Sequence, residues 1–533
     1  MRKLGDLVYL YDTTLRDGTQ GEGISLTLED KLKITAKLDE LGVHYIEGGW
    51  PGSNPKDLDY FKRVKELSLK QAKVSAFGST RMSGITVDDD PNIRALLEAD
   101  TPVVTIFGKS WDFHVTKALN TTLEENINMI WESVQYLKAQ KREVVYDAEH
   151  FFDGYKANPD YALATLKAAS NAGADWIVLC DTNGGALPGE IEEVLEQLGE
   201  EIDTPLGIHV HNDGELAVAN SLAAVKAGAR QVQGTINGFG ERCGNANICS
   251  VLPNLQLKMG MRCLSSESLK RLTEVSRYVS EIANMTPLSS QPFVGSSAFA
   301  HKGGIHVSAI LKDPSTYEHM DPGIVGNSRR VLVSELAGSS NIRYKAEELG
   351  LDLMKDVEST RRLSSEIKEM EYRGYQFEGA DASLELLLRR GLGQYEEFFI
   401  LESLKIFIEK KPANGGGVES INSEAMIKLW VGDQVMHTAA EGDGPVNALD
   451  NALRKALEQF YPYIQQMHLV DYKVRVLDGK DGTSAKVRVL IESADTSETW
   501  STVGVSENII EASWQALTDS MNYFLMRRTK FSS

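Results

Sequence analysis

The sequence contains few cysteines and no long apolar run. Four of its 533 residues are cysteine, too few for a disulfide framework in so long a chain, and no Cys-x-x-Cys pair indicates a zinc ribbon or a redox motif. No stretch approaches the roughly 18 consecutive apolar residues that a membrane span needs. The amino terminus lacks the apolar segment of a secretory signal. These absences predict a protein of a reducing compartment, the cytoplasm, with no membrane partner.

Positive charge is also scarce. The chain has 76 acidic and 56 basic residues, a formal net charge of −20. Binding to nucleic acid needs a basic surface, which this balance does not provide, so the acidity indicates a solubilising surface. An anionic substrate would need a local cluster of donors. The composition, 42% hydrophobic and 25% charged, is typical of a globular protein, and the length predicts two or three domains.

Short apolar runs alternate with helical patterns from residue 7 to about residue 250, the pattern of βα units on a parallel sheet. The predicted strands are residues 7–11, 44–48, 73–78, 103–107, 143–147, 175–180, 206–211 and 231–236. Eight such units predict an α/β fold with a (β/α)₈ TIM barrel over residues 1–265. A doubly wound sheet is the alternative, but the glycine fingerprint expected after its first strand is missing.

The pattern changes after the predicted barrel. Residues 266–394 are expected to form helical linker subdomains, and residues 395–533 contain an internal repeat. Each repeat unit predicts three strands and a helix, with a glycine-containing loop at 441–445 or 504–507 before the helix. The strands are expected around residues 404–408, 425–430, 434–439, 472–477, 484–491 and 499–504, and the helices over 446–459 and 508–525. Two βββα units predict a C-terminal α+β domain whose helices pack on one sheet face.

Two histidines stand at i and i+2 near the end of the seventh predicted strand. His209 and His211 should therefore face the barrel interior at the end where active sites of this fold lie. A single buried histidine is usually a core residue with satisfied hydrogen bonds. Two adjacent imidazoles are harder to satisfy in a core, so metal ligation is the favoured interpretation.

Polar motifs also follow the first and eighth predicted strands. The first motif includes Arg16, Asp17 and Gln20, and the second is a glycine-rich loop that ends at Asn245. Each alone is compatible with an ordinary polar loop. Closure of a barrel places strand eight beside strands one and seven, which brings the motifs together. A carboxylate, two imidazoles and a carboxamide oxygen suit Mg²⁺, Mn²⁺ or Zn²⁺.

The strings DTTLRDGTQ (12–20), HVHND (209–213) and NGFGERCGN (237–245) resemble the metal-dependent barrel family of isopropylmalate, homocitrate and citramalate synthases and hydroxymethylglutaryl-CoA lyase. Residues 298–320 resemble the subdomain that follows the synthase barrel. The loops EGDGPVNAL (441–449) and GVSENIIEAS (504–513) resemble the LeuA-type regulatory and dimerisation domain, which the lyases lack. The resemblance thus implies a homodimeric acyltransferase that condenses acetyl-CoA with a 2-oxoacid.

The resemblance also implies roles for individual residues. The metal ligands would be Asp17, His209, His211 and Asn245. Arg16 would bind the oxygens of the 2-oxoacid and stabilise the developing alkoxide, and Thr182 would bind its carboxylate. Glu149 would be the catalytic base. His306 and Tyr317 would serve the later proton transfers, supplied by the partner subunit.

Departures from the isopropylmalate synthase pattern favour pyruvate as the 2-oxoacid. Thr19 and Trp50 resemble the citramalate synthases, and Trp50 with Phe107 would narrow the pocket, although ordinary packing under a loop is the alternative. Pocket size alone distinguishes a methyl from an isopropyl group by about 1–3 kcal/mol. The alternatives are 2-oxoisovalerate as substrate, a carbon–carbon lyase, and a non-catalytic amino-acid sensor. The C-terminal loops predict a small anionic or zwitterionic effector, unless they are simple helix caps. The family resemblance implies that this effector is a branched-chain amino acid, isoleucine.

Overall fold

The computed structural model describes residues 6–334, 338–351, 357–411, 420–477 and 485–530. The chain forms two compact units, one of Met1–Phe299 with Met320–Arg329 and one of Ala300–His319 with Arg330–Ser533. Each unit has its own hydrophobic core. Within the described ranges, no helix has both the length and the apolar content that crossing a membrane requires.

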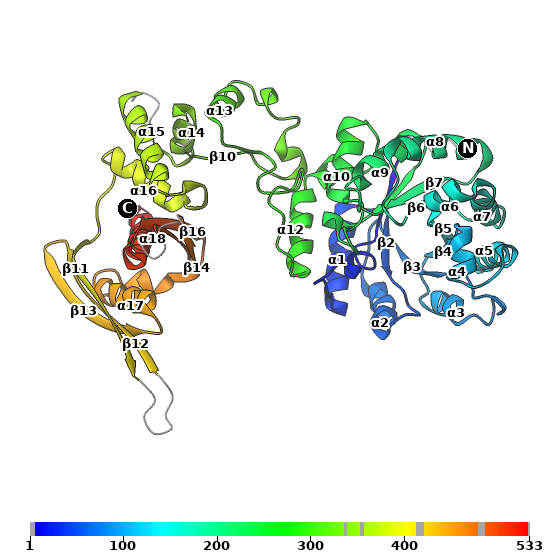
Figure 1. The fold of residues 1–533 in the computed structure, drawn as a ribbon, viewed down its shortest axis with the longest axis horizontal. Helices are drawn as coiled ribbons and strands as arrows, with labels where there is room; N and C mark the ends of the chain where they lie inside the picture. Colours follow the sequence, from blue (N-terminus) through cyan, green and yellow to red (C-terminus); the bar gives the residue numbers. More distant parts are fainter. Residues whose placement is uncertain (1–5, 335–337, 352–356, 412–419, 478–484, 531–533) are drawn as a thin grey trace. The chain divides into compact units, whose positions relative to one another are not determined.

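The first unit contains a closed barrel of eight parallel strands in sequential order (Figure 1). The strands are β1 Tyr9–Asp12, β2 Tyr45–Gly49, β3 Lys73–Ser79, β4 Val103–Lys109, β5 Glu143–Glu149, β6 Trp176–Asp181, β7 Leu206–Val210 and β8 Gln231–Gly234. Strand β1 pairs with β8 and closes the barrel. The predicted (β/α)₈ barrel is confirmed.

Helices cover the outside of the barrel. They are α1 Leu28–Leu41, α2 Pro55–Arg63, α3 Pro91–Glu98, α4 Asp112–Lys117, α5 Leu123–Ala139, α6 Phe151–Ala157, α7 Pro159–Asn171, α8 Pro188–Glu201, α9 Ala217–Lys226, α10 Ile248–Pro253, α11 Ser266–Leu269 and α12 Leu272–Ile282. Several begin at a side chain that accepts a backbone N–H, as Thr27 does for α1 and Asp90 for α3.

Residues on the barrel strands alternate between two cores. On β5, Val144 packs between strands and helices, whereas Val145 belongs to the cluster inside the barrel. The same alternation separates Leu10 from Tyr11 on β1. Parallel strands covered on both faces are apolar throughout. This is why short continuous apolar runs predicted these strands.

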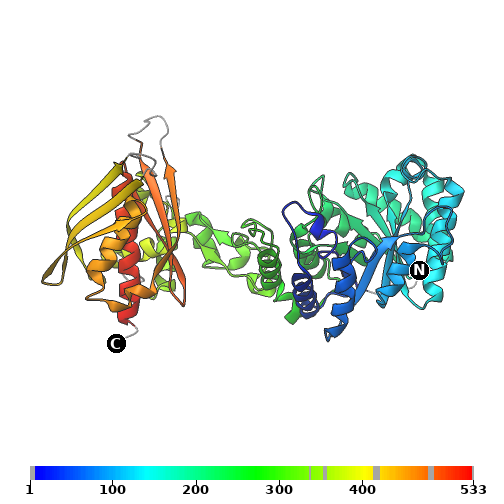
Figure 2. The same ribbon diagram turned by 90° about the horizontal axis from the view of Figure 1, so that it is seen from below.

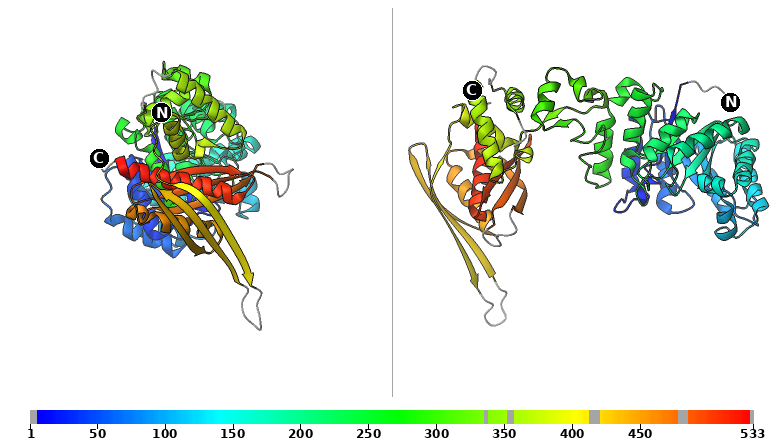
Figure 3. Two further views of the ribbon diagram at one scale, coloured as in Figure 1. Left: turned by 90° about the vertical axis from the view of Figure 1, so that its left-hand side faces the viewer. Right: turned by 45° about the horizontal axis from the view of Figure 1, so that its top comes forward.

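The second unit contains two three-stranded antiparallel sheets, each with one long helix. The elements are β11 Ile400–Lys411, β12 Ser420–Val431, β13 Gln434–Gly442 and α17 Pro445–Leu457, then β14 His468–Val476, β15 Val487–Ala494, β16 Thr499–Ser506 and α18 Ile509–Lys530. Helix α17 packs on β12 and β13, α18 packs on β15 and β16, and the helices contact each other between the sheets (Figure 2). Strands β11 and β12 form a long ribbon (Figure 3). The two predicted βββα units are confirmed, with residue 484 outside the described residues.

The two repeat units share a close contact between their last strand and their helix. At Gly442, at the end of β13, an added Cβ would lie 2.3 Å from the backbone nitrogen of Ala448. At Gly504, near the end of β16, it would lie 2.0 Å from the carbonyl oxygen of Ala512. Glycine at both positions allows the strand backbone to approach the helix. The equivalence supports an internal repeat.

The remaining helices of the second unit are α13 Gly304–Ile310, α14 Ser339–Glu348, α15 Val357–Tyr372 and α16 Asp381–Gly391, with the short strands β9 Ala300–His301 and β10 Arg330–Val331 paired in parallel. Helix α16 packs on α18 and β16. Leu384 and Leu388 of α16 share one buried cluster with Val503 of β16. This part of the predicted linker is therefore packed on the C-terminal sheets.

Candidate metal centre and active site

A cavity of about 230 Å³ opens among side chains at the carboxyl ends of the barrel strands. Its polar lining includes Arg16, Asp17, Gln20, Asp147, Glu149, Thr182, His209, His211, Glu241 and Arg242, and its aromatic lining is Trp50, Phe77 and Phe107. Active sites of barrels of this type lie at this end. Six of the predicted site residues therefore line one cavity.

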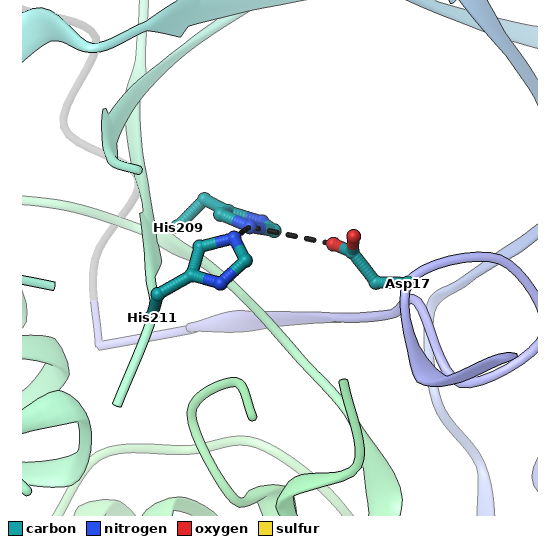
Figure 4. A group of neighbouring side chains, drawn as sticks. All are labelled: Asp17, His209 and His211. Carbon is teal, nitrogen blue, oxygen red and sulfur yellow. Dashed lines mark hydrogen bonds and ion pairs between the residues drawn. The ribbon is translucent and has the colours of Figure 1, made fainter. Parts of the chain in front are cut away.

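Asp17, His209 and His211 all line the cavity and point toward one another (Figure 4). His209 Nε2 lies 3.4 Å from Asp17 Oδ2 and 3.4 Å from His211 Nε2. One ligand atom from each residue lies within 4.8 Å of the others, and all three side chains are buried. The geometry suits a divalent cation between them.

Asn245 joins this group through the backbone. It forms an isolated antiparallel bridge with His211, and its amide Nδ2 donates to the carbonyl of Phe239 at 3.3 Å. Its Oδ1 and Asp17 Oδ2 are buried and have no hydrogen-bond partner among the described residues. Buried acceptors without a donor are costly, and a bound cation would satisfy both. The four predicted ligands thus fit a metal.

Strand β7 ends at Val210, one residue before its predicted end, and β8 ends at Gly234, two residues before its predicted end. The β7–β8 ladder stops at His209 and Gln233. After Gly234 the chain leaves the barrel, and Thr235 N–H donates to Ala246 O within the returning loop. His211 consequently pairs with Asn245 of that loop instead of continuing the parallel ladder.

The returning loop depends on Gly244. Its φ is +87°, in the left-handed region that favours glycine, and an added Cβ would lie 2.0 Å from the carbonyl oxygen of Gly238. The next residue, Asn245, donates its backbone N–H to that same carbonyl at 3.1 Å. The glycine therefore allows the tight loop that brings Asn245 to the site.

Arg16 is held by two carboxylates. Its Nε donates to Glu47 Oε1 at 2.5 Å and its Nη1 donates to Asp17 Oδ1 at 2.7 Å. Its guanidinium carbon lies 3.8 Å from the ring centre of Phe77. Burial acts to lower the pKa of Arg16, but the two carboxylates outweigh it and raise the pKa. Arg16 is therefore a fixed cation in the cavity wall.

The charges around the three ligands favour metal binding. Burial acts to raise the pKa of Asp17, but Arg16 and His209 outweigh it and lower the pKa below the usual value. Burial and the neighbouring His209 lower the pKa of His211 to about 4. At neutral pH Asp17 is ionised and His211 is neutral, the forms in which each binds a cation.

Glu149 and Thr182 lie at the ends of neighbouring strands. Glu149, the last residue of β5, forms an ion pair with Lys109 at the end of β4. Thr182, just after β6, accepts the backbone N–H of His150 on its Oγ1 at 2.9 Å. Because this contact uses the hydroxyl as an acceptor, its hydrogen is free to be donated. Both residues line the cavity.

His306 and Tyr317 lie in the second unit, and their rings stack on each other. The ring centres are 4.1 Å apart with an interplanar angle of 27°. His306 is on α13, and Tyr317 follows a short 3₁₀ turn. The structure brings the predicted pair together, and both rings are exposed.

Three buried polar residues near the site were not among the predicted site residues. Glu47 accepts hydrogen bonds from Arg16 and from the Tyr11 hydroxyl, and Asp147 and Gln233 are hydrogen-bonded to each other. Burial, with Glu47 nearby, raises the pKa of Asp147 well above its usual value. Asp147 stands two residues before Glu149 on β5, and residues at i and i+2 of a strand face the same side. This spacing could have predicted that Asp147 faces the cavity as Glu149 does.

Trp50, Phe77 and Phe107 form an aromatic wall of the cavity. Trp50 meets Phe77 and Phe107 edge to face at ring-centre distances of 5.9 and 5.7 Å, and the two phenylalanines stack at 5.4 Å. The Trp50 indole N–H donates to Asn92 Oδ1 at 2.8 Å, which fixes the ring. These contacts hold Trp50 in place, and both Trp50 and Phe107 line the cavity, as predicted.

Three family models match consecutive parts of the chain. The HMGL-like model matches residues 7–279, the homocitrate synthase post-HMGL domain-like model matches 293–374, and the LeuA allosteric (dimerisation) domain model matches 378–525. The HMGL-like match spans the barrel and all four candidate metal ligands, and that family is metal-dependent.

Five curated relatives described as (R)-citramalate synthase are 48% to 58% identical to this chain. The one from Geobacter sulfurreducens is 58% identical, covering 97% of this chain and 98% of the relative. A 2-isopropylmalate synthase from Methanocaldococcus jannaschii is 31% identical, over 98% of this chain and 96% of the relative. An (R)-citramalate synthase from the same organism is also 31% identical, over 97% of this chain and 100% of the relative.

Proposed function

The chain belongs to the HMGL-like family, and we propose that it condenses acetyl-CoA with pyruvate and water to give (R)-citramalate and CoA. One observation carries the proposal: relatives described as (R)-citramalate synthase reach 48% to 58% identity over at least 97% of this chain. Relatives at about 31% identity include one described as 2-isopropylmalate synthase and one described as (R)-citramalate synthase, so they do not distinguish the two activities. The choice of pyruvate therefore rests on the more similar relatives and on the cavity wall.

Four residues would hold the metal. Asp17, His209, His211 and Asn245 offer one carboxylate, two imidazoles and one carboxamide oxygen. Such a mixed set accepts Mn²⁺, Mg²⁺ or Zn²⁺. A cation bound there supplies a Lewis acid for the keto oxygen of the 2-oxoacid.

Arg16 and Thr182 would orient the 2-oxoacid. The Thr182 hydroxyl hydrogen is free for the substrate carboxylate, because Oγ1 already accepts from His150. Arg16 keeps donors beyond those used by Glu47 and Asp17, and these would stabilise negative charge on the keto oxygen. Arg16 and the Thr182 hydroxyl are the local donors that an anionic substrate needs in a chain with a net charge of −20.

Glu149 would remove a proton from the acetyl-CoA methyl group. The methyl carbon then forms a bond to the keto carbon of pyruvate, and the keto oxygen takes up a proton as it becomes a hydroxyl group. Water cleaves the thioester to a carboxylate and releases CoA as its thiol, which makes the sequence irreversible. Lys109 holds the Glu149 carboxylate at the cavity. His306 and Tyr317 would serve the later proton transfers.

The aromatic wall favours pyruvate over 2-oxoisovalerate. Trp50 is fixed by Asn92 and by two neighbouring phenylalanines, so the wall cannot easily make room for an isopropyl group. The lyase and sensor alternatives are less well supported. A LeuA-type domain is present, and the cavity is lined by Arg16, by Glu149 and by three of the four candidate ligands, Asp17, His209 and His211.

The test is CoA release from acetyl-CoA with pyruvate, 2-oxoisovalerate and 2-oxoglutarate offered in parallel. We expect pyruvate to exceed 2-oxoisovalerate in kcat/KM by at least about tenfold, the lower range of what pocket size provides. Trp50→Leu should narrow this ratio, whereas Trp131→Leu, on the exposed side of α5, should not. Equal use of the two acids by the native enzyme would contradict the choice of pyruvate.

We also propose a homodimer with an amino-acid effector, in the cytoplasm. The LeuA-type domain model is described as allosteric and dimerisation. Each repeat presents a glycine-containing loop before a helix, at Gly444 before α17 and at Gly504 to Glu507 before α18. Free backbone N–H groups at such helix ends favour a carboxylate. Isoleucine, the expected end product of a citramalate route, is the proposed effector. All four cysteines are free, which supports a reducing compartment.

A further inference from the structure

A chain of three buried polar side chains crosses the barrel interior from β7 to β5. His209 on β7 contacts Gln233 on β8, with Nδ1 and Oε1 2.9 Å apart. Gln233 in turn donates its Nε2–H to Asp147 Oδ1 on β5 at 3.0 Å. His209 and Gln233 are register partners on adjacent strands. The exposed fractions are 6%, 0% and 4%, so all three side chains are largely removed from solvent.

The chemistry of Asp147 fixes the direction of the Gln233 amide. A carboxylate oxygen only accepts, so the amide NH₂ must face Asp147 Oδ1. In the structure Gln233 Nε2–H donates to Oδ1, so a proton on the Asp147 carboxyl group belongs on Oδ2. The amide oxygen of Gln233 then faces His209, and it too only accepts. Nδ1 of His209 must therefore carry the hydrogen of the neutral ring.

A hydrogen on Nδ1 leaves the lone pair of His209 on Nε2. That atom lies 3.4 Å from Asp17 Oδ2 and 3.4 Å from His211 Nε2, two of the other candidate ligands. Without Gln233 the Asp17 carboxylate would attract a hydrogen onto Nε2, and this tautomer cannot bind a cation there. The position of one hydrogen thus depends on a residue two strands away from β7.

We propose that Gln233 and Asp147 are positioning residues that hold His209 in the Nδ1-protonated tautomer and so prepare Nε2 for the metal. The inference rests on the metal site of the proposed function. Asp147 acts on His209 through Gln233, and neither Asp147 nor Gln233 is among the four candidate ligands. The Gln233 amide has one donor end and one acceptor end. When its NH₂ group faces Asp147, its oxygen faces His209 and accepts the hydrogen of Nδ1.

The chain provides a matched control on the same strand. Gln231 stands two residues before Gln233 on β8 and is equally buried. Its Oε1 and Nε2 have no hydrogen-bond partner among the described residues. A loss of barrel packing would follow from replacing either glutamine, whereas a loss of metal binding should follow only from replacing Gln233.

The test measures Mn²⁺ binding alone, by calorimetry on the full-length chain after chelation, with no substrate present. Gln233→Met removes the acceptor and should raise the Kd for Mn²⁺ about 10- to 100-fold, the usual effect of losing such a partner. Gln231→Met should leave the Kd within about twofold of the native value. Asp147→Asn allows the amide to turn around, and we expect a smaller increase than in Gln233→Met.

The double variant Asp147→Asn with Gln233→Glu tests the direction of the hydrogen bonds. Its central carboxylate accepts from the NH₂ of the new asparagine and from His209 Nδ1–H, so the tautomer is restored. We expect a Kd for Mn²⁺ close to that of the native chain. Both variants are nearly isosteric with the native pair, so they remain informative if Gln233→Met does not fold.

Activity gives a second reading. At saturating Mn²⁺ the kcat of Gln233→Met should approach the native value, while the Mn²⁺ concentration for half-maximal rate rises. A Kd in Gln233→Met within about twofold of native overturns the proposal, as does a double variant that binds no better than Asp147→Asn. A native chain that binds Mn²⁺ but does not use pyruvate would contradict the proposed substrate and leave this inference standing.

Discussion

His209 contacts two of the other three candidate ligands, Asp17 and His211, and also contacts Gln233. His209→Ala removes one of two imidazoles, so we expect turnover to be lost and Mn²⁺ affinity to fall by at least about 100-fold. Calorimetry and CoA release measure these effects. His437→Ala, on the exposed face of β13, is the control and should keep both. Full activity after exhaustive chelation of the native enzyme would contradict the assigned site.

Glu149 provides a separate test of the chemistry. Glu149→Gln keeps the shape of the side chain and removes the proton acceptor, so kcat should fall by about 10²- to 10⁴-fold. Pyruvate affinity should change little, because Arg16 and Thr182, and not Glu149, are the residues proposed to bind pyruvate. Steady-state kinetics with varied pyruvate separate the two quantities. A near-native kcat would show that another group removes the methyl proton.

The sequence predicted the ligands better than the residues that support them. His209 and His211 were found because a strand sends i and i+2 to one face. Glu47, Asp147 and Gln233 were missed, because their importance depends on contacts between different strands. Glu47 on β2 accepts from Arg16 in the loop after β1, and Gln233 on β8 donates to Asp147 on β5. A single polar residue in a strand does not reveal which side chain it will meet.

At the scale of elements, the loop 235–247 determines where Asn245 lies. Gly244→Ala would place a Cβ 2.0 Å from Gly238 O at a φ of +87°. The left-handed conformation alone costs about 1–2 kcal/mol, and the contact adds to it. We expect a lower free energy of unfolding in urea and weaker Mn²⁺ binding. Gly189→Ala, with nothing within 4 Å of the added Cβ, is the control. Equal effects of the two substitutions would contradict this account.

Strand positions were predictable, but strand ends were not. The predicted ranges overlap the observed strands β7 and β8, although β8 carries two glutamines and only β7 is mainly apolar. Their ends depend on where the ladder stops, and that is set by the backbone of the loop returning through Ala246. Loop hydrogen bonds of this kind leave no periodic signal in the sequence.

At the scale of the whole chain, the C-terminal unit is expected to respond to isoleucine. Titration of isoleucine, leucine and valine against the intact enzyme should give a heat of binding and a reduced rate with isoleucine at least. A coupling of about 1–3 kcal/mol between the sites is enough for inhibition. If none of the three amino acids produces a heat of binding or a change in rate, the LeuA-type domain has only a structural role and the proposed effector is wrong.

This test requires the intact chain. A chain ending near residue 395 would leave the buried leucines of α16 without their partners on β16 and α18. The repeat of two βββα units was readable from the sequence, because each half repeats the same order of strands, glycine loop and helix. The packing of α16 on the second sheet was not, since it joins segments more than 100 residues apart.

The candidate ligands lie on both sides of the contact between β1 and β8. Asp17 follows β1 and Asn245 follows β8, while these two strands form the last pairing that closes the barrel. During synthesis the site cannot exist until residue 245 has left the ribosome and the first strand has found the eighth. A cation bound by residues on both sides of the β1–β8 pairing would stabilise the closed barrel, because separating these strands would also cost the binding free energy of the metal. Binding of the metal to a chain that is still being synthesised should therefore indicate that β1 and β8 have paired and the barrel has closed.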